Sequence, residues 1–226
     1  MAKRRSIILL FVIIVAAIVT IGAISQSVRE PAKHTSLAAS KEEAKIYAVL
    51  DELYNEPNGL WNVTPEDGRL LRILAETKRA KHIVEIGTSN GYSALWFALA
   101  LRMPGGKLIT HEIDPYRVSL AQENFERAGV SDMVTIVEGN AHETVRDVNE
   151  VIDILFIDAD KDGYLDYMNK LLSLVRPGGL IIAHNTMDRE PEMKDFLKAI
   201  TSNPDLETTI FHEQPYGMSV TLKKRK

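Results

Sequence analysis

Short apolar segments alternate with helical patterns along most of this chain, and this alternation most constrains its fold. Each segment has six or seven residues rich in Ile, Val and Leu, and a stretch with helical periodicity follows it. The pattern predicts a parallel sheet with helices on both faces. The expected strands are 82–87, 107–112, 134–139, 152–158 and 179–184, and the expected helices are 92–102, 115–129, 141–148 and 162–175.

The two ends of the pattern differ from its middle. Residues 41–55 have the periodicity of an amphipathic helix, and Thr64 followed by Pro65 predicts the start of a second helix. After a helix near 190–203, the segments 206–213 and 217–224 are separated by very few residues. Strands joined so closely can only pair antiparallel, so the sheet should end in a hairpin.

The N-terminal segment reads as a membrane anchor. Residues 7–24 form an apolar run of eighteen residues, and a helix of that length spans about 27 Å, close to the hydrocarbon core of a membrane. Three basic residues precede the run, which favours a cytoplasmic N-terminus. A cleaved signal peptide is the alternative. We expect residues 1–25 to be the anchor or signal, 26–40 a linker and 41–226 the folded domain.

Composition excludes several classes of function. The chain has no cysteine, which rules out disulfide scaffolds, thiolate zinc sites and cysteine nucleophiles. Residues 1–34 carry five basic groups and one acidic group, whereas the remaining residues carry 22 basic and 30 acidic groups. An acidic body argues against binding a nucleic-acid backbone.

A pair of glycines follows the first expected strand. Gly87 and Gly91 allow a tight turn and a close ligand approach at the start of a helix. The spacing differs from the G-x-G-x-x-G of dinucleotide enzymes, which argues against a tight pyrophosphate contact. The second strand ends at Glu112, where a carboxylate can accept hydrogen bonds from ribose hydroxyls. The sequence therefore predicts a nucleoside-containing ligand.

Polar side chains also end two later strands. Asp158 and Lys161 follow the fourth strand, and His184 and Asn185 end the fifth. Because ligands of open α/β sheets collect at the carboxyl ends of the strands, we expect Asp158, His184 and Asn185 to converge on a divalent metal. Such a metal could orient two oxygens of an acceptor, and Lys161 could take the proton from one of them.

The run VEIGTSNGYSALWFALAL, together with Glu112, resembles the class I S-adenosylmethionine (SAM)-dependent methyltransferases. The stretches 61–71, 138–143, 156–164 and 178–186 narrow the resemblance to the catechol and caffeoyl-CoA O-methyltransferases. It covers about residues 42–226 and implies a Rossmann-like seven-stranded sheet of order 3-2-1-4-5-7-6 with strand 7 antiparallel. It also implies that SAM contacts Asn62, Val63, Glu85, Gly87, Ser93, Glu112, Ile113, Asn140, Ala141 and Asp158.

The resemblance implies methyl transfer from SAM to a hydroxyl of a small catechol-like aromatic acceptor, assisted by a metal and by Lys161 and Asp158 as catalytic residues. The chain departs from the family where His184 stands in place of an aspartate. Mg²⁺ should bind less well there, and Mn, Co, Fe or Zn become more plausible. The alternative is a metal-independent methyltransferase with His184 as the base. The oligomeric state stays open, a homodimer included.

Three further residues have expected roles beside this site. Trp61 and Tyr164 are candidates to line the acceptor site by their position in the chain. Asp160 is expected to cap the helix that follows it.

Overall fold

The computed structural model describes residues 37–56, 60, 62–102, 105–212 and 216–225. These residues form one seven-stranded sheet of order β3-β2-β1-β4-β5-β7-β6, in which only β7 runs antiparallel to its neighbours. The predicted sheet order and terminal hairpin are therefore confirmed. The strands are β1 (His82–Ile86), β2 (Lys107–Glu112), β3 (Val134–Glu138), β4 (Ile152–Ile157), β5 (Val175–His184), β6 (Leu206–Phe211) and β7 (Met218–Lys223).

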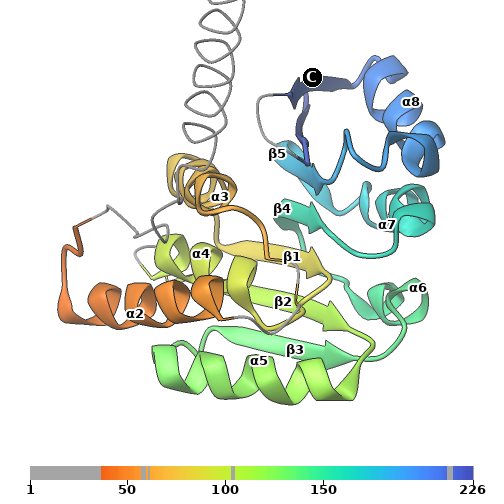
Figure 1. Ribbon diagram of the computed structural model, residues 1–226. Coiled ribbons are helices and arrows are strands. Elements are labelled where there is room, and N and C mark those ends of the chain that lie inside the picture. Colours follow the sequence, from red (N-terminus) through yellow and green to blue (C-terminus); the bar gives the residue numbers. More distant parts are fainter. Residues whose placement is uncertain (1–36, 57–59, 61, 103–104, 213–215, 226) are drawn as a thin grey trace, which may run out of the picture. The chain divides into compact units, whose positions relative to one another are not determined.

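The helices occupy both faces of the sheet (Figure 1). They are α2 (Lys41–Asn55), α3 (Pro65–Lys78), α4 (Tyr92–Leu101), α5 (Pro115–Ala128), α6 (Ala141–Thr144), α7 (Tyr164–Leu171) and α8 (Lys194–Ser202). The described part of the chain also forms three short 3₁₀ turns: η1 (Val145–Asp147), η2 (Lys161–Gly163) and η3 (Glu190–Met193).

Side chains that alternate along β1, β4 and β5 contribute to two separate cores. Ile83 packs with residues of α2, α3, α4 and α5, whereas Val84 packs with residues of α7 and α8. Along β4, Phe156 joins the first core and Leu155 the second. Strands buried on both faces are apolar throughout, which is why the sequence shows short continuous runs instead of an apolar–polar alternation.

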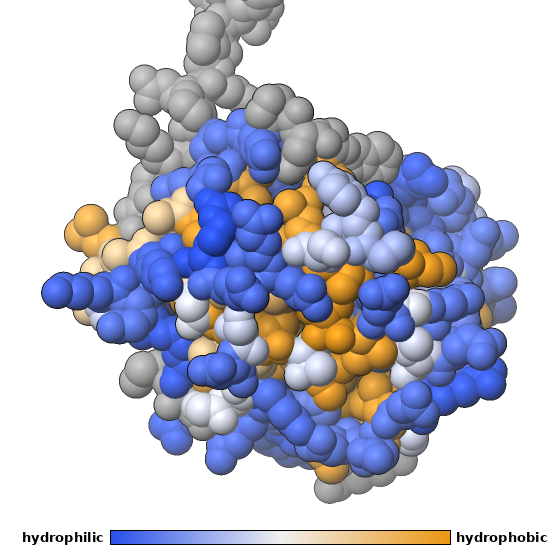
Figure 2. Space-filling view, turned by 90° about the horizontal axis from the view of Figure 1, so that it is seen from below, coloured by the Kyte–Doolittle hydropathy of each residue, from blue (hydrophilic) through white to orange (hydrophobic). Residues whose placement is uncertain are grey.

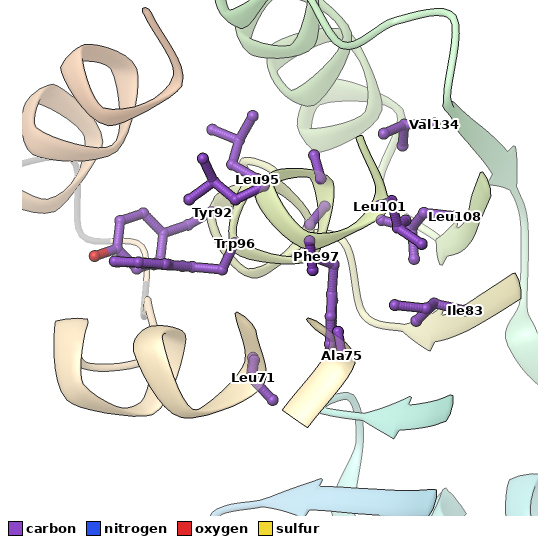
Figure 3. Packing of buried hydrophobic residues seen from close by; sticks show 14 of the residues in the cluster. Leu71, Ala75, Ile83, Tyr92, Leu95, Trp96, Phe97, Leu101, Leu108 and Val134 are labelled. Carbon is purple, nitrogen blue, oxygen red and sulfur yellow. The ribbon is translucent and has the colours of Figure 1, made fainter. Parts of the chain in front are cut away.

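Helix α4 lies at the centre of the first core (Figure 3). Every residue of α4 except Ser93 is buried. Tyr92 and Trp96 pack edge to face, and Phe97 meets Phe156 of the sheet at 5.6 Å between ring centroids. A helix that is apolar on all sides needs such complete burial. This fixes the position of its N-terminus, where the glycine turn begins.

Local capping explains where the first helices begin. Ser40 precedes α2 and accepts a hydrogen bond from the backbone N–H of Glu43. Thr64 caps α3 in the same way by accepting from Asp67, with Pro65 at the first helical position. Both starts agree with the sequence prediction, because an N-cap side chain supplies the partner that a first-turn N–H lacks.

The segment after β4 differs from the prediction. The expected helix 162–175 is instead η2 followed by the shorter α7, and β5 begins at Val175. Pro177 and two glycines follow Val175 and disfavour a helix. Asp160 stands at the N-cap position of η2 as predicted, but its side chain makes no cap hydrogen bond and instead accepts one from Tyr167.

The predicted anchor 1–25, and most of the predicted linker, lie outside the described residues. Among the helices that the structure does describe, none is long and apolar enough to cross a membrane.

One face of the molecule is mostly hydrophilic, with hydrophobic residues reaching the surface in a band across its middle (Figure 2).

Candidate active site

The turn between β1 and α4 lies tightly against the end of β4. Gly87 has a φ of 99°, and a Cβ atom there would come within 2.2 Å of the carbonyl oxygen of Asp158. Gly91 has a φ of 86°, and a Cβ atom there would come within 2.6 Å of the Phe125 ring. No other residue type fits either place without displacing its neighbours. The two glycines therefore let the turn pack closely against Phe125 and against the backbone of Asp158.

Glu112 joins this turn to the end of β2. Its carboxylate accepts hydrogen bonds from the backbone N–H of Ser89 at 2.8 Å and from those of Ile113 and Asp114 at 3.0 and 3.1 Å. Ser89 has a φ of 50°, a conformation that non-glycine residues seldom adopt. An ionised carboxylate offers about four acceptor positions, so Glu112 keeps capacity for a ribose hydroxyl.

Glu85 lies fully buried beneath the turn. Ser93 and Thr110 donate hydrogen bonds to its two oxygens at 2.5 and 2.6 Å. Burial raises the pKa of Glu85 to about 7, although both hydroxyls oppose that shift. The structure thus brings the predicted residues Glu85 and Ser93 together, with the Ser93 hydroxyl directed at Glu85.

The other predicted cofactor residues make their contacts outside this network. Ile113 is 64% exposed beside Glu112. Asn140 caps α6 by accepting from the N–H of His142, and Ala141 begins that helix. Val63 is buried, and Asn62 donates to the carbonyl of Leu53. The buried Oδ1 atom of Asn62 has no hydrogen-bond partner among the described residues.

The chemical side of the site is built on Asp158 and Lys161. The Lys161 ammonium lies 3.0 Å from Oδ1 of Asp158 and 2.8 Å from the Tyr164 hydroxyl. Burial opposes ionisation of Asp158, but the nearby His184 and Lys161 outweigh it and lower the pKa of this carboxyl to about 2. Tyr164 itself is fully buried, so it positions Lys161 and does not line an acceptor site.

His184 lies between two carboxylates. Its Nε2 atom is 3.3 Å from Oδ2 of Asp67, and its Nδ1 atom is 3.4 Å from Oδ2 of Asp158. Burial lowers the proton affinity of this ring, but Asp158 and then Asp67 outweigh burial and raise the pKa of His184 to about 9. An imidazole facing acceptors on both sides carries a proton on both nitrogens.

Asp67 is a site residue that the sequence analysis does not identify. It lies in the first turn of α3, the helix that Thr64 caps. Its contact with His184 joins positions 117 residues apart, and no local pattern encodes such a contact. The one signal was an acidic residue in a buried first turn, where an unpaired charge would be costly.

Asn185 is directed away from the other predicted metal ligands. Its φ is 60°, and its side chain donates to both oxygens of Asp188, at 3.2 and 3.4 Å. Asparagine is one of the few residues that tolerate this left-handed conformation. In the structure Asn185 therefore turns the chain after β5.

The donor set does not fit the predicted metal. Both oxygens of Asp158 already face cationic side chains, both nitrogens of His184 face carboxylates, and Asn185 contacts Asp188. Within the ranges that the structure describes, no three His, Asp or Glu side chains are grouped so as to hold a metal ion. The predicted metal site has no support in this arrangement.

An aromatic ring reaches the surface beside His184. The ring of Tyr216 is 5.9 Å from that of His184, and Tyr216 is 42% exposed. Met187, on the loop after β5, is similarly exposed. These side chains are better placed than Tyr164 to contact an acceptor. Trp61, the other predicted lining residue, lies outside the described residues.

Comparison with known proteins identifies the family. The sequence profile of the O-methyltransferase family matches residues 36–195. This chain belongs to that family. It is 42% identical over 150 residues to the catechol O-methyltransferase of Niastella koreensis, covering 65% of this chain and 67% of the relative. It is 32% identical over 191 residues to caffeoyl-CoA O-methyltransferase 1 of Eucalyptus globulus, covering 73% and 76%.

Solved structures agree with the family assignment. An O-methyltransferase from Bacillus cereus in complex with SAH has 28% identity and a TM-score of 0.68, covering 80% of this chain and 91% of that one. The O-methyltransferase TomG from Streptomyces achromogenes in complex with SAM has 26% identity and a TM-score of 0.69, covering 82% and 91%. The chain is therefore a SAM-dependent O-methyltransferase of the catechol and caffeoyl-CoA type.

Proposed function

We propose that this O-methyltransferase transfers the methyl group of SAM to a hydroxyl of a small catechol-like aromatic. The observation that carries the proposal is the position of Lys161. Asp158 and Tyr164 hold its amine at the carboxyl end of β4, and the backbone of Asp158 lies against Gly87 of the ligand turn. Asp158 thus connects the two parts of the site, its backbone lying against the ligand turn and its carboxylate binding Lys161.

The residues around the turn suit SAM. Gly87 and Gly91 shape the turn after β1, and Glu112 beside it keeps an acceptor position for a ribose hydroxyl. Exposed Ile113 offers an apolar surface beside Glu112. When bound, SAM supplies an electrophilic methyl group on a sulfonium.

The chain's own residues supply the proton transfer and the positioning. In the resting site Lys161 is an ammonium paired with Asp158. It would have to give up that proton first, and its free amine would then take the proton of the acceptor hydroxyl when the methyl group is transferred. Asp158 and Tyr164 fix the direction of the Lys161 amine. Holding two reactants in one orientation accounts for a large part of the rate enhancement in such reactions. His184 is unsuited to be the base, since both its nitrogens face carboxylates.

The test is methyl transfer by the purified full-length chain from labelled SAM to catechol, resorcinol and phenol. We expect catechol to be methylated at least tenfold faster than phenol, with the Lys161→Met variant as the control for enzyme-dependent transfer. SAM binding without transfer to any of the three acceptors would refute the proposed acceptor class.

We also propose that residues 7–24 hold the chain in a membrane. The apolar run behind Lys3, Arg4 and Arg5 supports this. The charge rule would place the enzyme domain across the membrane from the cytoplasm, where SAM is made, so the orientation needs its own test. Intact mass of the membrane-extracted protein separates an anchor from a cleaved signal, and protease protection reports the side.

A further inference from the structure

His184 stands at the end of β5, and its side chain is clamped between two acidic groups. Asp67 comes from the first turn of α3, and Asp158 follows β4. The side chains of His184 and Asp67 are 4% and 1% exposed, and that of Asp158 is 19% exposed. Water therefore screens these interactions weakly, and the ring can satisfy both carboxylates only by donating from both nitrogens.

Each carboxylate of the cluster already faces a cationic side chain. Asp158 has His184 at Oδ2 and Lys161 at Oδ1, so both of its oxygens contact positive groups. Asp67 faces His184 and Thr64 with Oδ2, and its buried Oδ1 has no hydrogen-bond partner among the described residues. Buried charges are tolerated when they are paired in this way. A divalent ion would have to displace Lys161 or strip a proton from His184 before it could bind.

We propose that His184, held between Asp67 and Asp158, takes the place of a divalent cation in this site, and that methyl transfer by this chain needs no metal. The inference has two halves. Its catalytic half, that methyl transfer needs no metal, rests on the proposed function. Its binding half, that the native site does not take up a metal ion, rests on the contacts alone.

In this arrangement His184 is a positioning residue. It fixes the Asp158 carboxylate on the side opposite Lys161, so that Lys161 is held in one direction. Asp67 in turn fixes the ring of His184 and connects the site to α3. A carboxylate at position 184 would reverse the charge balance, because it would stand between Asp67 and Asp158 and replace a cation with a third acidic group. That combination favours a hard divalent cation.

The experiment measures Mn²⁺ binding to the full-length chain by titration calorimetry, with the variants His184→Asp and His184→Asn. Aspartate and asparagine have nearly the same size and differ in charge. His184→Asn therefore controls for the loss of the imidazole ring. We expect no stoichiometric Mn²⁺ binding to the native chain or to His184→Asn. We expect His184→Asp to bind Mn²⁺ at least tenfold more tightly than either.

Methyl transfer is measured in parallel with excess chelator and with Mg²⁺ or Mn²⁺. We expect native transfer to change less than twofold between these conditions. Stoichiometric Mn²⁺ binding that is lost in His184→Asn would make His184 a metal ligand and would overturn the inference. Transfer that stops in chelator and returns with metal would also overturn it, while leaving the proposed function intact.

The two proposals fail in distinguishable ways. If no acceptor is methylated under any condition and the native chain still binds no Mn²⁺, the acceptor class is wrong and the binding half of the inference is upheld. If His184→Asp does not fold, its melting curve will show this. The Mn²⁺ titration of the native chain and the chelator assay then still test whether the native enzyme binds or needs a metal.

Discussion

The contact between Asp67 and His184 can be measured as a coupling energy. The perturbation is a double-mutant cycle of Asp67→Asn, His184→Asn and the double variant. Both side chains are nearly inaccessible, and the charged atoms lie 3.3 Å apart. At an effective dielectric constant of about 20, the direct attraction over that distance is roughly 5 kcal/mol. Desolvation offsets much of it, and hydrogen bonds to charged groups contribute about 1.5–3 kcal/mol net.

We therefore expect a coupling energy of about 2 kcal/mol, obtained from urea unfolding of the four proteins at pH 7. The asparagine at position 67 can still accept from Thr64, so the helix cap is preserved and the cycle isolates the charge on Asp67. Coupling below about 0.5 kcal/mol would refute the argument that His184 is bound through both nitrogens. Mutations at distant, independent sites already deviate from additivity by up to about that amount.

Three other perturbations test separate parts of the account. Gly87→Ala would place a Cβ atom 2.2 Å from the carbonyl oxygen of Asp158, at a residue with a positive φ. The resulting overpacking and backbone strain should lower the free energy of unfolding, measured by urea titration, by about 3 kcal/mol. SAM binding should also become weaker. Because the pKa of His184 is raised from 6.5 to about 9, its stabilisation is fully present below about pH 6.5 and is lost as the pH rises through 9. The stability difference between the native chain and His184→Asn should shrink by about 3 kcal/mol over that range, and a difference independent of pH would contradict it. Glu112→Gln should weaken SAM binding at least tenfold in calorimetry, with little change in the rate at saturating SAM, since Glu112 is expected to contact only the ribose.

The fold could be predicted from the sequence because its signals are local. Strands buried on both faces leave continuous apolar runs, and Thr64 with Pro65 indicates the start of α3 wherever that helix packs. The start of β5 was missed because Val175 pairs with Ile152 before the register shifts at residues 152–154. That irregularity depends on the neighbouring strand, so residues 175–179 alone do not reveal it.

The site was predictable only in part. The ends of β1, β2 and β4 bring Gly87, Glu112 and Asp158 to one edge of the sheet, as the topology requires. The direction of each side chain is not set by topology. Asn185 follows β5 as expected, but its positive φ directs its amide to Asp188. Asp67 contacts His184 from α3, which precedes the first strand, and the strand pattern does not predict where that helix packs.

The central claim is that Lys161 carries the proton transfer at a site where SAM binds independently of it. The measurement that tests it most directly is single-turnover methyl transfer to catechol by the native chain and by Lys161→Met, with the SAM dissociation constant of each determined by calorimetry. The account predicts a rate constant at least a hundredfold lower for the variant, the usual size of a general-base contribution, and a dissociation constant within threefold. An unchanged rate constant in a variant that binds SAM normally would contradict it.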